Sequence, residues 1–133
     1  MANEAVLIIE TQKPISMTCA DNTGIEKGTI LKLSDYFTVS ASTGAVDIVG
    51  GIAATEKIAN DGKTKIAVYR GGIFKVVASG TITVGKAVTT KGSNNLVLAA
   101  AVNDENVLGI ALETAAEGES FLMELRPTEM ELA

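Results

Sequence analysis

The residues with the clearest chemical potential in this chain form a near-match to a phosphate-binding loop. Residues 80–86 have the spacing GxxxxGK, in which backbone N–H groups and a lysine would hold phosphates. The next residue, which should be Ser or Thr to reach Mg²⁺, is Ala87. The β-branched residues between the glycines favour a strand and a turn, and no helix is expected to follow and offer its N-terminus. We therefore expect no nucleotide or other cofactor.

Acidic side chains are the second candidate for chemistry. Asp104 and Glu105 are adjacent, and Glu113, Glu117 and Glu119 follow them. Catalysis by two carboxyl groups needs one desolvated and the other ionised, whereas these lie in polar, turn-like stretches. The chain has no histidine, the side chain best suited to proton transfer near neutral pH. The sequence therefore predicts that the protein is not an enzyme and has no catalytic residues.

The sequence gives little indication of a metal site or of redox chemistry. Cys19 is the only cysteine, so neither an intrachain disulfide nor a CxxC metal site can form. Its place in the alternating segment 15–20 indicates a small buried apolar residue. A calcium-binding loop of the DxDxDG type is also missing from the sequence. We expect no bound metal.

Charge is unevenly distributed along the chain, whose net charge is −5. Residues 62–103 carry six basic and no acidic side chains, and residues 104–133 carry eight acidic side chains and one arginine. This pattern fits either solvated faces or complementary surfaces on neighbouring subunits. Tyr69 and Phe74 in the basic segment could stack on bases, but the acidic chain as a whole argues against direct nucleic-acid binding.

Short alternating apolar runs separated by Gly-rich turns predict one all-β domain, a compact small barrel or β-clip with one or two short helical turns. The helical turns are expected at residues 55–60 and 113–116, a bulge at Gly50-Gly51, and a hairpin turn at Gly71-Gly72. Pro127 is expected to end the last strand. The predicted organisation is an N-terminal arm (residues 1–14), a β domain (15–127) and a C-terminal tail (128–133).

The N-terminal arm contains one apolar burst, Val6, Leu7, Ile8 and Ile9, before Pro14. It is either the first strand of the domain's own core or an extended arm that adds a strand to a partner. Apolar runs in the chain are too short for a secretory signal or a membrane span. We expect a soluble protein made in the cytoplasm, with no membrane partner.

One motif occurs twice in the sequence. Residues 51–53 and 109–111 both read Gly-Ile-Ala, and each is followed by a Gly-containing turn, an alternating run and an arginine. The two arginines, Arg70 and Arg126, are the only ones in the chain. A repeated strand–turn–strand unit indicates scaffold geometry, because a catalytic centre usually occurs once. Arg70 and Arg126 are predicted at equivalent strand ends, as candidates for ion pairs across a subunit boundary.

The order and spacing of these motifs resemble the tailed-phage capsid decoration, or cement, proteins, long catalogued as a domain of unknown function. The resemblance covers roughly residues 15–126. Its motifs are residues 24–31, 43–45 with 51–53, 68–74, 82–88 and 107–115.

This resemblance implies a small β protein that forms a homotrimer on the outer surface of an icosahedral phage head in the virion. There it would bind the major capsid protein, bridge capsomers and stabilise the capsid, with residues 2–14 reaching across the surface. It implies no catalytic residues. The alternative is an adhesive or glycan-binding β-module displayed on a particle, although five aromatic residues are a thin supply for stacking on sugars.

Overall fold

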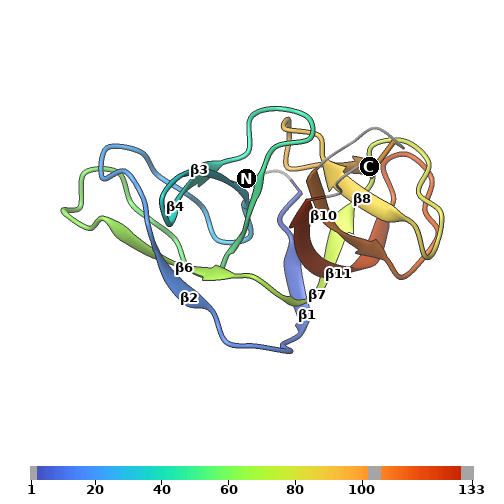
Figure 1. Cartoon of the computed structure of the whole chain (residues 1–133), viewed down its shortest axis with the longest axis horizontal. Helices are drawn as coiled ribbons and strands as arrows, with labels where there is room; N and C mark the ends of the chain where they lie inside the picture. The colour runs from blue at the N-terminus through green and yellow to red at the C-terminus, as the bar shows by residue number, and fades with distance from the viewer. Residues whose placement is uncertain (1–2, 102–105, 130–133) are drawn as a thin grey trace.

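The computed structural model of the chain describes residues 3–101 and 106–129, and these residues form an all-β structure. A closed five-stranded barrel and a six-stranded sheet lie side by side, the barrel at the left and the sheet at the right of Figure 1. The described residues contain no helix, and so none that is long and apolar enough to cross a membrane. The expected all-β class is confirmed.

The barrel is built from five short strands in the order β2-β4-β3-β5-β6. Their bounds are Ile15–Thr18 (β2), Ile30–Asp35 (β3), Thr38–Ala41 (β4), Val49–Ala53 (β5) and Lys65–Tyr69 (β6). Because side chains alternate along a strand, every second residue points inward. The barrel interior is therefore filled by small and branched apolar residues: Met17, Cys19, Ile25, Leu31, Val39, Ala53, Ile66 and Val68.

The six-stranded sheet has the order β1-β7-β11-β10-β8-β9. Its strands are Val6–Ile9 (β1), Gly72–Val77 (β7), Ala87–Thr90 (β8), Val97–Ala99 (β9), Asn106–Ala111 (β10) and Ser120–Glu129 (β11). Its core contains the two largest fully buried side chains, Phe74 and Phe121, and also includes Ile30, Val49 and Ile52 from the barrel. The two sheets therefore share this core, and the barrel interior forms a second one.

The same strand topology occurs twice in the chain. Strands β7 to β11 correspond in order to β2 to β6, and all four antiparallel pairings of the first set recur in the second. A short parallel contact also recurs, between Thr18 and Thr38 and between Ala78 and Val97. We call residues 15–70 the first half and residues 71–129 the second half.

The repeated Gly-Ile-Ala motif marks the same point of both halves. A Cβ atom on Gly51 would collide with the carbonyl oxygen of Tyr69, and one on Gly109 with that of Glu124. Gly51 also has φ +137°, a conformation that L side chains rarely adopt. The motif is therefore kept by the close approach of two strands, which agrees with the scaffold role expected from its repetition.

Several local expectations were wrong. Residues 55–60 and 113–116 form turns and isolated β-bridges instead of helical turns, since Lys57 pairs with Ile25 and Ala115 with Ile82. Gly71-Gly72 does not close a hairpin, because β6 belongs to the barrel and β7 to the six-stranded sheet. The glycines instead carry the chain from one half to the other. The bulge at Gly50 is confirmed by a register shift between Leu31 and Lys32.

Pro127 does not end the last strand but lies within β11. The register between β10 and β11 shifts at this level, between Val107 and Gly109. A proline, which lacks an N–H donor, is tolerated at such an irregularity. Residues 128 and 129 of the predicted tail belong to β11, and residues 130–133 lie outside the described part of the chain.

Candidate interaction surfaces

The N-terminal apolar burst forms an edge strand of the protein's own sheet. β1 pairs with β7 alone, with Val6 opposite Lys75 and Leu7 opposite Phe74. Leu7 packs on the core, and Ala5 is buried with its N–H donating to the Gly28 carbonyl at 3.0 Å. The structure therefore shows the first of the two alternatives: this segment is a strand of the protein's own sheet. Its exposed side chains are Val6, Ile8 and Ile9. Their contact with a capsid stays a prediction.

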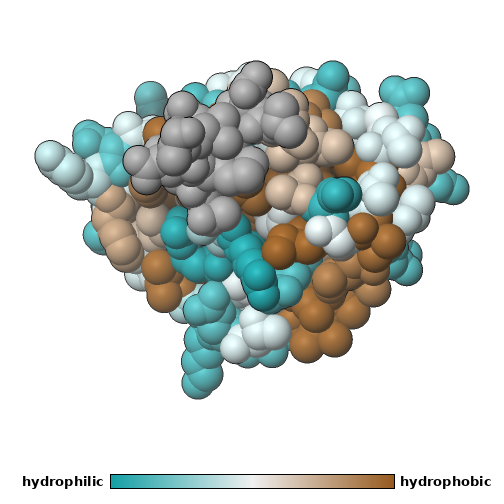
Figure 2. Space-filling model, turned by 45° about the vertical axis from the view of Figure 1, so that its right-hand side comes forward, coloured by the Kyte–Doolittle hydropathy of each residue, from teal (hydrophilic) through white to brown (hydrophobic). Residues whose placement is uncertain are grey.

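The outer face of the six-stranded sheet carries apolar side chains beside the charged Lys75 and Glu124. On β7 and β11 the residues between the core positions include Ile73, Val77 and Leu122, which are partly exposed. Ile110 and Leu112 continue this face next to β11. Figure 2 brings this half forward and shows hydrophobic side chains gathered at the lower right. A sheet with apolar residues on both faces normally has both faces covered, so this face suits a protein contact.

The two arginines lie at different positions of the repeat. Ile52 pairs with Tyr69 and Ile110 with Glu124, so the residue equivalent to Arg70 is Leu125. The expected equivalence of Arg70 and Arg126 was therefore wrong by one residue.

Their contacts within the chain differ as well. Arg70 is half-buried, and its Nη1 donates to the carbonyl oxygens of Val49 and Gly50, at 3.1 Å each. Arg126 is exposed, with its Nε 3.2 Å from Glu124 Oε2. Arg70 therefore has a structural role inside its own half. Pairing of either arginine with another subunit stays a prediction.

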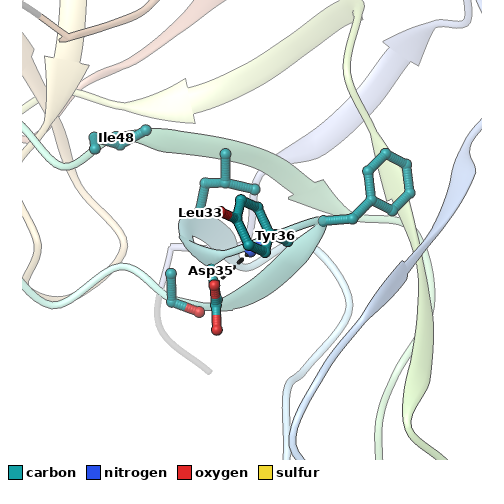
Figure 3. Close-up of a pocket in the computed structure, with 6 residues that line it drawn as sticks. Leu33, Asp35, Tyr36 and Ile48 are labelled. Carbon is teal, nitrogen blue, oxygen red and sulfur yellow. Dashed lines mark hydrogen bonds between the residues drawn. The ribbon is translucent and has the colours of Figure 1, made fainter.

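An aromatic tip projects from the hairpin that joins β3 and β4. Tyr36 is 95 % exposed, and Phe37, with φ 49°, is also exposed. They line a shallow hollow of about 370 Å³ with Leu33, Ser34, Asp35 and Ile48 (Figure 3). The Tyr36 N–H donates to Asp35 Oδ1 at 2.8 Å, and the Thr38 hydroxyl donates to the Tyr36 carbonyl at 2.8 Å.

These local hydrogen bonds hold two aromatic side chains away from the core. Exposed aromatic residues on an ordered turn are typical of protein-binding positions. This site was not predicted from the sequence. The signal was the Asp-Tyr-Phe-Thr order, in which an Asp side chain favours a turn.

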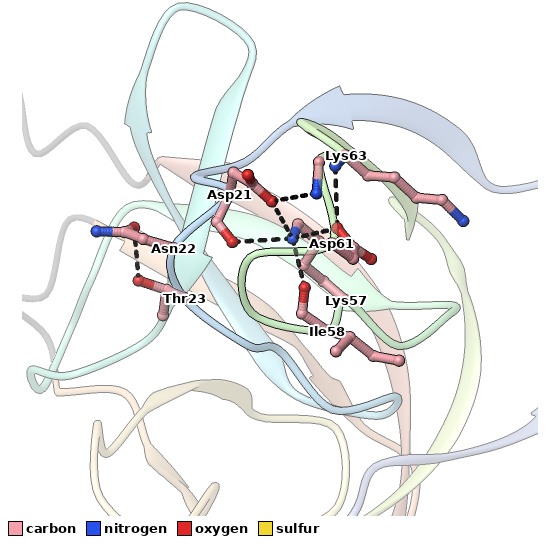
Figure 4. A network of polar contacts seen from close by, with 8 residues as sticks. Asp21, Asn22, Thr23, Lys57, Ile58, Asp61 and Lys63 are labelled. Atoms are coloured by element: carbon pink, nitrogen blue, oxygen red, sulfur yellow. Dashed lines mark hydrogen bonds and ion pairs between the residues drawn. The ribbon is translucent and has the colours of Figure 1, made fainter.

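A buried lysine holds together two loops of the first half (Figure 4). The Lys57 side chain is 1 % exposed, and its Nζ lies 2.9 Å from Asp21 Oδ1 and 2.7 Å from Asp61 Oδ1. It also donates to the carbonyl oxygens of Asp21 and Ile58, at 3.0 and 2.6 Å. This network was not predicted from the sequence, because no local sequence pattern distinguishes Lys57 from an exposed lysine.

The charges in this network stabilise one another. Burial alone would lower the pKa of Lys57, but hydrogen bonds with Asp61 and Asp21 outweigh it and keep the pKa above its ordinary value. The hydrogen bond from Lys57 in turn lowers the pKa of Asp61. A charged amine with all its protons engaged is a structural clasp and is unsuited to act as a nucleophile or a base.

The segment resembling a phosphate-binding loop is bonded within the fold. The N–H groups of Ile82 and Gly85 donate to the carbonyl oxygens of Ala115 and Ala111, both at 2.8 Å. The Val84 N–H donates to Thr114 Oγ1 at 3.2 Å. These donors are therefore not presented together to a phosphate. In the described ranges, no three His, Cys, Asp or Glu residues lie close enough together to hold a metal ion.

Comparison with known proteins identifies the family. Residues 9–126 match the phage cement protein family. The chain belongs to this family. The resemblance inferred from the sequence motifs is thus confirmed, and the cement protein is a structural protein of a phage head.

A solved structure supports the fold of the cement protein. The head fiber gp8.5 N base of bacteriophage phi29 is similar to it, with a TM-score of 0.55 and 17 % sequence identity. The similarity covers 94 % of this chain and 100 % of that one. Among curated proteins, no match was found. The likeness to the phi29 protein therefore concerns the fold alone.

The surfaces described above are those that a cement protein can use for binding. They are the exposed row on β1, the outer face of the six-stranded sheet and the aromatic tip at Tyr36 and Phe37. All three carry exposed or partly exposed apolar side chains, and two of them lie on or beside β7. The cement protein thus presents three separate surfaces with exposed apolar side chains.

Proposed function

We propose that this cement protein binds the outer surface of an icosahedral head as a homotrimer and stabilises the capsid, without catalysing a reaction. The observation that carries the proposal is the family match over residues 9–126, which spans nearly all of the fold. The partners in this proposal are the major capsid protein and two further copies of the chain.

The row on β1 supports contact with the capsid. Val6, Ile8 and Ile9 are exposed on a strand whose second edge is unpaired in the described part of the sheet. Covering one half-exposed aliphatic side chain stabilises a complex by about 1 kcal/mol. Such a small contribution becomes effective when three subunits bind together, since linked sites raise the overall affinity by about 10²–10⁴-fold.

The proposal is tested with purified protein and empty heads of the corresponding phage that lack it. We expect saturable co-sedimentation with the heads and a higher temperature of head disruption when the protein is bound. The Val6→Ser and Ile9→Ser double variant should bind about tenfold more weakly, equivalent to about 1.4 kcal/mol. Substitutions are preferable to deletion of residues 2–14, because Ala5 and Leu7 belong to the core.

Ile58→Ser is the matched control, since Ile58 is equally apolar and 61 % exposed but lies on the Lys57 loop. It should bind heads like the unmodified protein. Absence of any binding to heads would contradict the proposed function. Binding that is equal for the double variant and the control would remove only the role of β1.

A further inference from the structure

The contact between the two halves includes a pair of buried isoleucines, in addition to hydrogen bonds such as that from the Asp47 N–H to Thr90 Oγ1. Ile30 on β3 and Ile52 on β5 pair with each other on the outside of the barrel. They are buried there because they share a core with Phe74 and Leu125 of the second half. At the same junction the tip of the β8–β9 hairpin reaches the first half, where Asn95 Oδ1 accepts from the Ile30 N–H at 2.8 Å.

The second half carries the equivalent receiving surface, and among the described residues this surface stays partly exposed. Ala87 pairs with Ile110 as Ile30 pairs with Ile52, so these positions are equivalent. Ile52 is 0 % exposed, whereas Ile110 and Ala87 are half-exposed. The exposed side chains of Val84 and Leu112 flank them. The receiving surface of the second half is thus Val84, Ala87, Ile110 and Leu112.

The second half contacts the first half through a surface that we call the docking surface. The first half has a counterpart of this surface, and there it is exposed. Ile15 pairs with Val68 as Phe74 pairs with Met123, so Ile15 is the counterpart of Phe74. Phe74 is 1 % exposed and Ile15 is 41 % exposed. The tip of the β3–β4 hairpin, Tyr36 and Phe37, is the counterpart of the tip that carries Asn95. The docking surface of the first half is thus Ile15, Tyr36 and Phe37, with Arg70 in the place that Leu125 has in the second half.

We infer that the first half of one copy docks on the second half of the next copy, repeating between chains the contact that joins the halves within a chain. Ile15 and the Tyr36–Phe37 tip cover Val84, Ile110 and Leu112 of the neighbour. The inference rests on the homotrimer in the proposed function and specifies its interface. Such a head-to-tail contact uses two different surfaces and closes into a ring when the rotation between copies permits.

The chemistry of the two tips supports a second copy as the occupant. Within the chain, the polar tip meets polar groups, and the Asn95 side-chain amide donates to the carbonyl oxygen of Gly28 at 2.9 Å. Between copies, the counterpart of Gly28 is Gly85, since their N–H groups donate to Ala53 and Ala111. Beside Gly85 stands the exposed Val84, an apolar neighbour for an aromatic tip. The polar tip at Asn95 thus meets polar backbone groups, and the aromatic tip at Tyr36 and Phe37 would meet the apolar Val84.

The test uses the full-length chain and sedimentation velocity. Ile15→Glu blocks the docking surface, and Ile110→Glu blocks the receiving surface. Each variant alone should change from trimer to monomer while keeping the circular dichroism spectrum of the folded protein. Ile58→Glu is the matched control and should remain trimeric. Leu112→Glu is a second variant of the receiving surface if Ile110→Glu does not fold.

Mixing the two blocked variants identifies the head-to-tail geometry. The Ile15→Glu copy keeps an intact receiving surface, and the Ile110→Glu copy keeps an intact docking surface. One sound interface can therefore form, and the mixture should contain dimers that grow no further. A contact that placed Ile15 and Ile110 together in a symmetric pair would not be restored in this way.

Three results would overturn the inference: trimers of both blocked variants, a mixture that stays monomeric, or a monomeric unmodified chain at high concentration. A Tyr36→Ala variant that stays trimeric and loses binding on a glycan array would also overturn it, and would assign the tip to sugars. Head binding is measured separately. Dimers in the mixture with no binding to heads would contradict the proposed function and leave the interface standing.

Discussion

Lys57 and Ala115 occupy the same position in the two halves, each in an isolated bridge opposite an isoleucine, Ile25 or Ile82. Both are buried. In the first half a charged amine with two carboxylates fills the place, and in the second half a methyl group does. The fold therefore does not require the ionic network, which stabilises only the loops of the first half.

Replacing Lys57 tests the clasp directly. Lys57→Ala copies the residue of the second half but leaves Asp21 and Asp61 without their shared cation. The side chains of Asp21 and Asp61 are 38 % and 24 % exposed, so the loss comes from the missing ion pairs and hydrogen bonds of Lys57, and we expect a clear fall in Tm. Lys63→Ala is the control, since the Lys63 side chain is exposed. A fall of the same size in both variants, measured by calorimetry, would contradict the clasp.

The same network predicts how stability depends on acid. The pKa of Asp61 lies below its ordinary value of 3.8 in the folded protein, so the unfolded chain binds protons more readily. Its contribution to stability is present above that ordinary value and is lost as the pH falls through the lower, folded value. Asp61→Asn should therefore flatten the decline of Tm between about pH 5 and pH 2. An unchanged slope would exclude Asp61 as its source.

The repeated glycines should be intolerant of a methyl group. Gly51→Ala and Gly109→Ala each drive a Cβ into a carbonyl oxygen of the facing strand, and we expect losses above about 2 kcal/mol in the free energy of unfolding. Gly118→Ala is the control, because Gly118 has φ +83° but open space around it. It should cost about 1 kcal/mol. Urea titration distinguishes them, and equal losses would refute the steric explanation.

Leu108 should contribute strongly to the joined core. It stands where the first half has Gly50, and it is fully buried in the core that both sheets share. Leu108→Ala should cost about 2–5 kcal/mol, because it leaves a cavity as well as losing apolar contact. Ile58→Ala, at a side chain that is 61 % exposed and lies outside the proposed interface, should cost less than about 1 kcal/mol. The reverse order in chemical denaturation would place the shared core elsewhere.

Cys19 should report unfolding. The thiol is buried in the barrel, and burial raises its pKa above the ordinary value of 9.0. A thiol with a raised pKa supplies little thiolate, so the native protein should react slowly with a disulfide reagent near neutral pH. Reaction should become fast once denaturant opens the barrel. Rapid labelling of the native protein would mean that the barrel opens locally.

Periodicity and turn residues were enough to predict the all-β class, the bulge at Gly50 and the burial of Cys19. They failed where the outcome depended on which strands pair. Gly71-Gly72 has the chemistry of a hairpin turn, yet its flanking strands belong to different sheets. Pro127 has the chemistry of a strand end, yet a register shift in the partner strand accommodates it.

The candidate sites were predicted less well than the fold. Val6–Ile9 was recognised as an apolar segment, but its pairing with β7 depends on contacts distant in sequence. Lys57 and its two aspartates are separated along the chain, so no local pattern could reveal them. Arg70 and Arg126 share a spacing in the sequence, but strand register places them one position apart.

The different tips of the two hairpins have a consequence for how the chain recognises itself. If the two halves were identical, the first half could bind the second half of its own chain or that of a neighbour equally well. Copies would then undergo domain swapping. Here the Asn95 side chain is hydrogen-bonded to the backbone of Gly28 and Ile30 of the same chain, whereas Tyr36 and Phe37 present aromatic rings in place of an amide. In the proposed interface, the amide tip would therefore act in folding and the aromatic tip in assembly.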